Sequence, residues 1–248
     1  MRDTGWLRIS GSGVAAIFVV ATALALRYGP RPAGRFAAVA LGAFGIQQYA
    51  VGFALTRAPE GEPRDLDVVD ALTLSRGLCA AIIAGAAASG VRDRRGLVGR
   101  LAWPLALCGA TLTDWIDGPL ARRRGRGPSR LGRILDLELD SWLTFATTLA
   151  AARLGTLHLM CVVTPSLRYA AMLTPSLSYA EIFALGKTDR ARNLGIPQMT
   201  LALAAFAPFA GRRTVRFART ASLVLLPIHV SALLAALLRS RSSPSAVR

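Results

Sequence analysis

Acidic residues are scarce in this chain. Asp and Glu together number 14 among 248 residues, against 30 Lys and Arg, and the formal net charge is +16. Histidine is scarcer still, because only His158 and His229 are present, on separate apolar segments. This excludes a metal site built from paired histidines and predicts that both side chains pack against neighbouring residues. Any place where carboxylates do gather is therefore informative.

Cysteine and aromatic residues are also few. The three cysteines, Cys79, Cys108 and Cys161, lie in apolar segments without a Cys-x-x-Cys pair. This excludes a disulfide framework and a thiolate metal site, and predicts small buried hydrophobic residues. Aromatic residues make up 7% of the chain, and the basic residues form short clusters between apolar runs. The positive charge therefore indicates loops beside anionic lipid headgroups rather than a nucleic-acid surface.

Hydrophobic residues are abundant instead. They make up 53% of the chain, and the mean hydropathy is +0.43, which is typical of a membrane protein. We therefore expect an all-α, polytopic integral membrane helical bundle. Eight apolar segments are candidate membrane helices: 13–28, 36–56, 71–91, 99–120, 134–156, 158–184, 196–211 and 220–238.

A polar break at 57–70 divides these segments. It contains two prolines and five of the 14 acidic residues. We expect residues 1–69 to be an N-terminal extension with two membrane helices and residues 70–238 to be a six-helix membrane domain. The Ser-rich tail 239–248 is expected to be disordered.

The distribution of basic residues gives a weak prediction of orientation. They are slightly more frequent on the side of the membrane that carries the aspartate stretch 114–140, which favours a cytoplasmic position for that stretch. The clusters 92–100 and 212–219 are expected to be loops on the opposite side, and they weaken this bias.

Four aspartates gather between two apolar segments: Asp114, Asp117, Asp136 and Asp140. The first two are three residues apart and the last two are four apart, so each pair shares one face of a helix. If the two helices are antiparallel neighbours, all four lie at one membrane face. Their charges would repel one another without cations between them, and oxygen ligands favour Mg²⁺ or Mn²⁺. The sequence therefore predicts a site for two divalent cations, which would bind phosphates.

Small residues and one arginine flank the aspartates. Gly118, Ala121 and Gly132 allow a ligand to approach the backbone closely, although ordinary helix–helix packing would explain the same residues. Arg122 offers a bidentate cation for phosphate. The other arginines of this loop are expected to be solvated.

The order of these residues resembles the signature of the CDP-alcohol phosphatidyltransferases, integral membrane enzymes that make phospholipids. Every fixed position is present in Asp114-x-x-Asp117-Gly118-x-x-Ala121-Arg122 … Gly132-x-x-x-Asp136-x-x-x-Asp140. The gap from Arg122 to Gly132 is nine residues, one more than is usual in the family, and we expect the loop to absorb it. The segment Asp70-Ala-Leu-Thr73-Leu-Ser-Arg76 also resembles the start of the family's first membrane helix.

The resemblance implies an enzyme that transfers a phosphatidyl-type group from a CDP-linked lipid, typically CDP-diacylglycerol, to an alcohol acceptor, with release of CMP. It implies that Mg²⁺ or Mn²⁺ is held by Asp114, Asp117, Asp136 and Asp140. Asp140 would also be the general base. The CDP moiety would lie against Gly118, Ala121, Arg122 and Gly132. A homodimer is implied too, in a bacterial cytoplasmic membrane with the active site facing the cytoplasm.

Basic residues further along the chain are candidates for binding a phosphate on the acceptor: Arg168, Lys187, Arg190 and Arg192. For Lys187, Arg190 and Arg192, anchoring at the membrane surface is the alternative. Arg168 lies inside an apolar run, where an arginine usually faces a polar cavity. The sequence does not distinguish glycerol 3-phosphate, an inositol phosphate, serine or another alcohol as the acceptor.

Two other functions stay open. A polytopic transporter would bind a permeating cation with its aspartates, but transporters spread such residues over several spans near the midplane. Here the four acids lie at one end of two neighbouring segments. A family member without activity would serve as a scaffold, and the complete set of aspartates argues against that.

Overall fold

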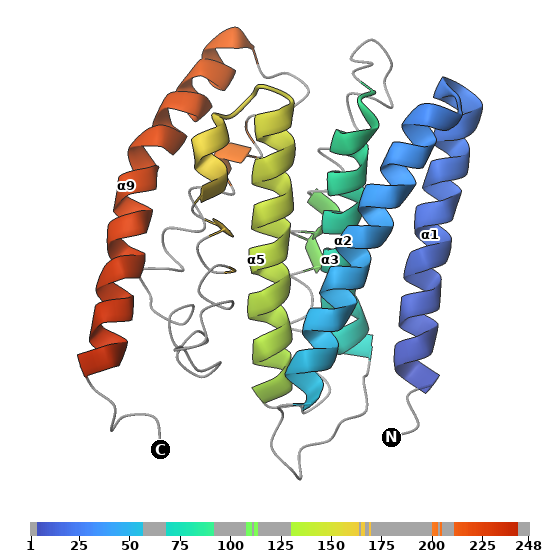
Figure 1. Ribbon diagram of the computed structural model, residues 1–248, viewed down its shortest axis with the longest axis horizontal. Coiled ribbons are helices and arrows are strands. Elements are labelled where there is room, and N and C mark those ends of the chain that lie inside the picture. The colour runs from blue at the N-terminus through green and yellow to red at the C-terminus, as the bar shows by residue number, and fades with distance from the viewer. Residues whose placement is uncertain are drawn as a thin grey trace. The chain divides into compact units, whose positions relative to one another are not determined.

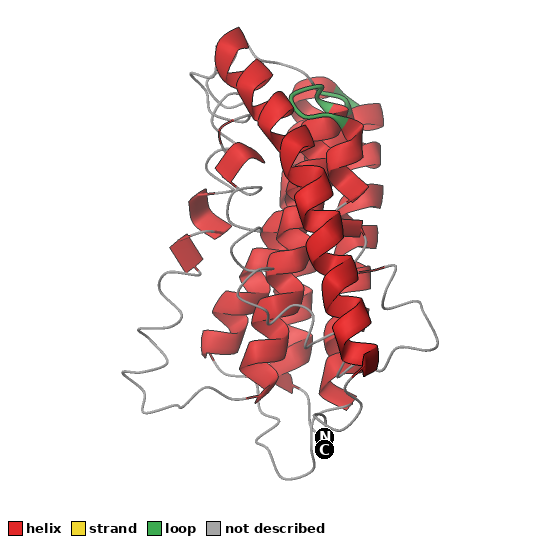
Figure 2. Cartoon of the chain, turned by 90° about the vertical axis from the view of Figure 1, so that its left-hand side faces the viewer, coloured by secondary structure: helices red, strands yellow, loops and turns green. Residues whose placement is uncertain are grey.

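Helices and short loops make up the described structure, which is a computed structural model of the chain. The described residues are 4–56, 68–91, 108–110, 112–113, 130–163, 165–166, 169, 200–202, 204 and 211–242. No strand occurs among them (Figure 2), so the all-α prediction is confirmed for this part of the chain. Two of its helices are long and apolar enough to cross a bilayer, with candidate spans at Ser10–Tyr28 and Asp70–Ser89. The count of six core helices stays a prediction.

The chain forms two compact units, Met1–Ala146 and Thr147–Arg248. The first begins with a helical hairpin of α1 (Thr4–Tyr28) and α2 (Pro30–Thr56) (Figure 1). A single residue, Gly29, joins the two helices with a φ of +89°, a conformation that glycine adopts without steric cost. Pro30 then opens α2, where its fixed φ suits the first helical position and its missing N–H is no loss.

Helix α3 (Val68–Ser89) packs against α2 in this first unit. Asp70 lies in its first turn, where a carboxylate is favoured by the partial positive charge of the helix end. Close packing of the two helices depends on small residues. A Cβ atom at Gly85 would lie 2.8 Å from both Phe36 O and Ala40 Cβ, so only glycine permits this approach. The hairpin and α3 thus share one apolar core.

Helix α5 (Arg130–Arg153) begins in the first unit and ends in the second. Its buried leucines, Leu135, Leu139 and Leu143, recur every fourth residue, which gives the helix one apolar stripe. Trp142 packs beside the core that α1, α2 and α3 form. This stripe fixes the rotation of α5 about its own axis, and therefore which of its residues lie beside the core.

The second unit contains the 3-10 turn η1 (Leu159–Val162) and α9 (Arg212–Ser242). The expected loop at 212–219 is wrong, because α9 begins at Arg212. Arginine is a good helix former, and neither glycine nor proline interrupts 212–226, so the helix extends well before its apolar part. His158 accepts a hydrogen bond from Met160 N at 3.3 Å, and the buried His229 has Nδ1 2.9 Å from Leu225 O. Both histidines therefore have local packing roles, as expected.

The cysteines agree only partly with the prediction. All three are free thiols. Cys161 is buried and Cys79 is partly buried, whereas Cys108 is exposed. The expectation of a buried side chain was wrong for Cys108. In a chain of membrane composition, lipid rather than protein can surround an apolar side chain, so a hydrophobic segment need not bury every residue within the protein.

Candidate active site on helices α3 and α5

Asp136 and Asp140 lie one turn apart on α5. Each directly follows a buried leucine of the apolar stripe, so the two carboxylates border the buried face of the helix. Their side chains keep 50% and 49% of their surface exposed. The pair is therefore held at the edge of the core while its other side stays open.

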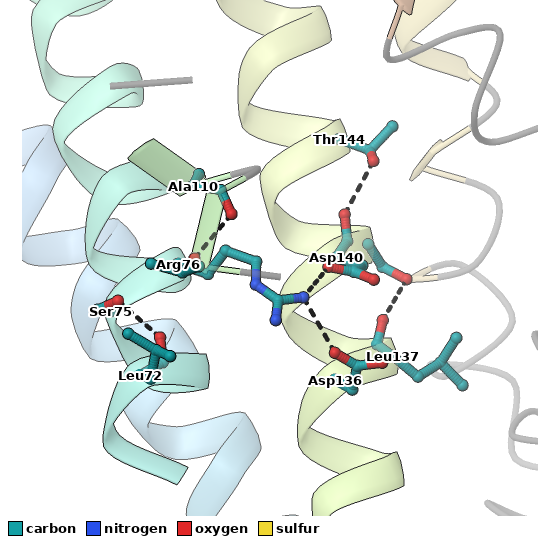
Figure 3. A network of polar contacts seen from close by, with 10 residues as sticks. Leu72, Ser75, Arg76, Ala110, Asp136, Leu137, Asp140 and Thr144 are labelled. Atoms are coloured by element: carbon teal, nitrogen blue, oxygen red, sulfur yellow. Dashed lines mark hydrogen bonds and ion pairs between the residues drawn. The ribbon is translucent and has the colours of Figure 1, made fainter. Parts of the chain in front are cut away.

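The guanidinium group of Arg76 on α3 binds both carboxylates (Figure 3). Arg76 Nη1 donates to Asp136 Oδ1 at 3.0 Å and also to Asp140 Oδ1. The arginine side chain is only 1% exposed. A buried charge is costly unless it is paired, so the two aspartates supply the counter-charge that allows Arg76 to lie inside the unit.

Hydroxyl groups near the pair are engaged elsewhere. Thr144 Oγ1 donates to Asp140 O at 2.8 Å, and Ser141 Oγ donates to Leu137 O at 2.7 Å. On α3, Ser75 Oγ donates to Leu72 O at 2.6 Å (Figure 3). These hydroxyls bond to the backbone of their own helices, a common arrangement for Ser and Thr. The contact of Asp136 and Asp140 with Arg76 is therefore separate from these backbone hydrogen bonds.

Helix α2 fixes the position of α3 at the level of Arg76. Gln47 Nε2 donates to Leu74 O at 3.4 Å. The residue after the arginine is Gly77, where an added Cβ would lie 2.2 Å from the amide of Gln47. The absence of a side chain at Gly77 leaves room for the Gln47 amide beside the turn that carries Arg76.

The structure brings together two of the predicted site residues, Asp136 and Asp140, on one face of α5. Gly132 lies one turn earlier in the same helix. The remaining predicted site residues lie outside the described residues: Asp114, Asp117, Gly118, Ala121, Arg122, Arg168, Lys187, Arg190 and Arg192. The predicted meeting of all four aspartates stays a prediction.

Sequence reasoning missed Arg76 as a site residue. The segment that ends at Arg76 resembles the start of the family's first membrane helix, but this resemblance assigns the arginine no role. The available signal was its position within the apolar run 71–91, since a charge inside a membrane segment usually has a partner there. The spacing of the aspartates also gives no role to Glu138, which lies between them in sequence and is 7% exposed.

The described residues fit a divalent cation in part. Asp136 and Asp140 supply carboxylate oxygens, the ligands that Mg²⁺ and Mn²⁺ prefer. These oxygens already converge on one positive group, and about half of each side chain is accessible. Among the described residues, no group of three or more His, Cys, Asp or Glu is arranged to hold a metal. Further ligands would have to come from outside those residues.

Comparison with known proteins assigns the family. The model of the CDP-alcohol phosphatidyltransferase family matches residues 67–238, well over half of the chain. The matched region includes α3 and α5, and with them Arg76, Asp136 and Asp140. No curated protein and no solved structure matched the chain. The chain therefore belongs to the CDP-alcohol phosphatidyltransferases, a family of membrane-associated phosphotransferases that act on CDP-alcohols and use divalent metal ions.

Proposed function

We propose that this protein transfers a phosphatidyl-type group from a CDP-linked lipid, such as CDP-diacylglycerol, to an alcohol acceptor in phospholipid biosynthesis. One observation carries the proposal: within the family match, Asp136 and Asp140 stand one turn apart with their carboxylates directed to a single positive charge. Such a pair is suited to binding cations that in turn bind a diphosphate.

The proposed reaction is a displacement at phosphorus. The acceptor oxygen forms a bond to the lipid-bearing phosphorus, the bond from that phosphorus to the bridging oxygen breaks, and CMP leaves. Bound Mg²⁺ or Mn²⁺, held by Asp114, Asp117, Asp136 and Asp140, would supply neutralisation of the diphosphate charge. Asp140 would accept the hydroxyl proton of the acceptor. Its half-exposed carboxylate is accessible to such a group.

The proposal also covers the residues that bind CDP and the acceptor, the oligomeric state and the membrane. The CDP moiety lies against Gly118, Ala121, Arg122 and Gly132. A phosphate on the acceptor is bound by some of Arg168, Lys187, Arg190 and Arg192. The enzyme is a homodimer in a bacterial cytoplasmic membrane, with its active site facing the cytoplasm, and residues 1–69 form an extension to the domain 70–238.

A direct assay tests the transferase activity. The purified protein is incubated with CDP-diacylglycerol, Mg²⁺ or Mn²⁺ and a panel of alcohols that includes glycerol 3-phosphate, an inositol phosphate and serine, and CMP is measured. We expect CMP release that depends on one class of acceptor. CMP release with none of the acceptors would contradict the proposal and favour a transporter or an inactive member of the family.

A further inference from the structure

Burial differs sharply across the cluster of Arg76, Asp136 and Asp140. The arginine is 1% exposed, whereas about half of each carboxylate side chain is accessible. The Arg76 side chain extends from α3 toward α5, and its guanidinium contacts both carboxylates (Figure 3). The positive charge of this site is therefore buried within the protein, beside the two carboxylates.

This positive charge alters what the carboxylates can bind. Among the described residues, two ionised carboxylates and one guanidinium carry a net charge of −1 rather than −2, and Asp114 and Asp117 would add negative charge in the proposed site. A divalent ion beside the aspartates is attracted by both carboxylates but repelled by the arginine, and such terms are large at a partly buried site. An anionic diphosphate that binds together with the ion compensates for the missing negative charge.

We propose that Arg76 is a positioning residue that makes binding of the divalent ion depend on the CDP group. The guanidinium orients Asp136 and Asp140 and lowers their affinity for the ion alone, so that ion and nucleotide bind strongly only together. This inference rests on the proposed function for the identity of the nucleotide. Because such coupling is reciprocal, the ion strengthens CDP binding by the same factor.

Binding of Mn²⁺ to the purified full-length protein tests this role without turnover. Free Mn²⁺ is measured by electron paramagnetic resonance, with and without CDP, and the Mn²⁺ that CDP binds in a protein-free titration is subtracted. In the wild type, we expect CDP to tighten Mn²⁺ binding by about fivefold or more. In Arg76→Met, we expect Mn²⁺ alone to bind on the order of tenfold more tightly, because the repelling charge is gone, and the effect of CDP to shrink.

Three further variants separate charge from packing. Arg76→Lys keeps the charge, so the effect of CDP should persist. Arg76→Gln is a second neutral variant, for use if Arg76→Met does not fold. Arg31→Met removes an exposed arginine at the start of α2, and its Mn²⁺ affinity should equal that of the wild type.

Two results would overturn the inference, and they differ from the result that a purely structural arginine would give. Equal Mn²⁺ affinity of the wild type with and without CDP would overturn the inference, as would a folded neutral variant that binds Mn²⁺ alone no more tightly than the wild type. A purely structural arginine would lower the melting temperature of the variants without raising Mn²⁺ affinity. The proposed function fails separately if no CMP is released from CDP-diacylglycerol while CDP still tightens Mn²⁺ binding.

Discussion

At the scale of residues, the stability of the cluster of Arg76, Asp136 and Asp140 depends more on the two aspartates than on the arginine. The arginine side chain is 1% exposed, whereas about half of each aspartate side chain is accessible. Loss of both carboxylates would leave the buried charge without its partners on α5. Loss of the arginine would leave two carboxylates that keep about half of their surface accessible. Breaking a buried pair by removing one partner typically costs about 3–5 kcal/mol because an uncompensated buried charge remains.

We therefore predict that the double variant Asp136→Asn/Asp140→Asn loses more stability than Arg76→Met. The double variant should lose about 3 kcal/mol or more of unfolding free energy, and Arg76→Met clearly less. Reversible unfolding in detergent, followed by circular dichroism, measures both. An Arg76→Met variant that is less stable than the double variant would show that the arginine contributes mainly by packing.

A second prediction concerns the proton acceptor. Asp140→Asn keeps the size of the side chain and removes its basicity, so we expect CMP release to fall by about 10²-fold or more while the helical content stays unchanged. Thr144→Val is the matched control, because the Thr144 hydroxyl donates to the backbone carbonyl of Asp140 and not to its carboxylate. If Asp140→Asn retains the activity of the wild type, Asp140 is not the base.

The sequence predicts part of this cluster for a clear physical reason. A spacing of four residues on a helix is enough to place Asp136 and Asp140 on one face. The partner of the pair lies 60 and 64 residues away on another helix, and no local pattern contains that information. The sequence therefore predicts that the carboxylates need cations, but it does not identify Arg76 as the cation already present.

At the scale of elements, hydropathy locates helices better than it locates their ends. The predicted segment 13–28 is the apolar part of α1, which extends from Thr4 to Tyr28, and 220–238 is the apolar part of α9. Polar and basic residues continue a helix wherever their backbone hydrogen bonds can form. The contacts between helices depend on individual small residues, such as the glycines of α3 that face α2.

Gly85→Ala should destabilise the protein, because its new Cβ atom would meet the backbone oxygen of Phe36 and the Cβ of Ala40 at 2.8 Å. Overpacking of this kind typically costs about 1–3 kcal/mol. Gly42→Ala in α2 is the control, since nothing lies within 4 Å of the added atom, and it should stabilise by about 0.5–1 kcal/mol. Thermal unfolding in detergent compares the two. Equal melting temperatures would contradict the observed packing of α2 on α3.

At the scale of the whole molecule, the boundary of the family match does not coincide with the boundary of a compact unit. The match begins at residue 67, yet the unit Met1–Ala146 also contains α1 and α2. Helix α2 packs on α3 next to the turn that carries Arg76, through Gln47 and Gly77. Residues before the family match thus help to position an element of the candidate site.

The central claim is that Asp136 and Asp140 act through divalent cations on a CDP-linked lipid. The most direct test is CMP release from CDP-diacylglycerol by chelator-treated protein, before and after addition of Mg²⁺ or Mn²⁺, with the wild type and Asp136→Asn compared. We predict no CMP release before addition, recovery in the wild type afterwards, and little or no recovery in Asp136→Asn. CMP release that persists without divalent ions, or full recovery in Asp136→Asn, would contradict the claim.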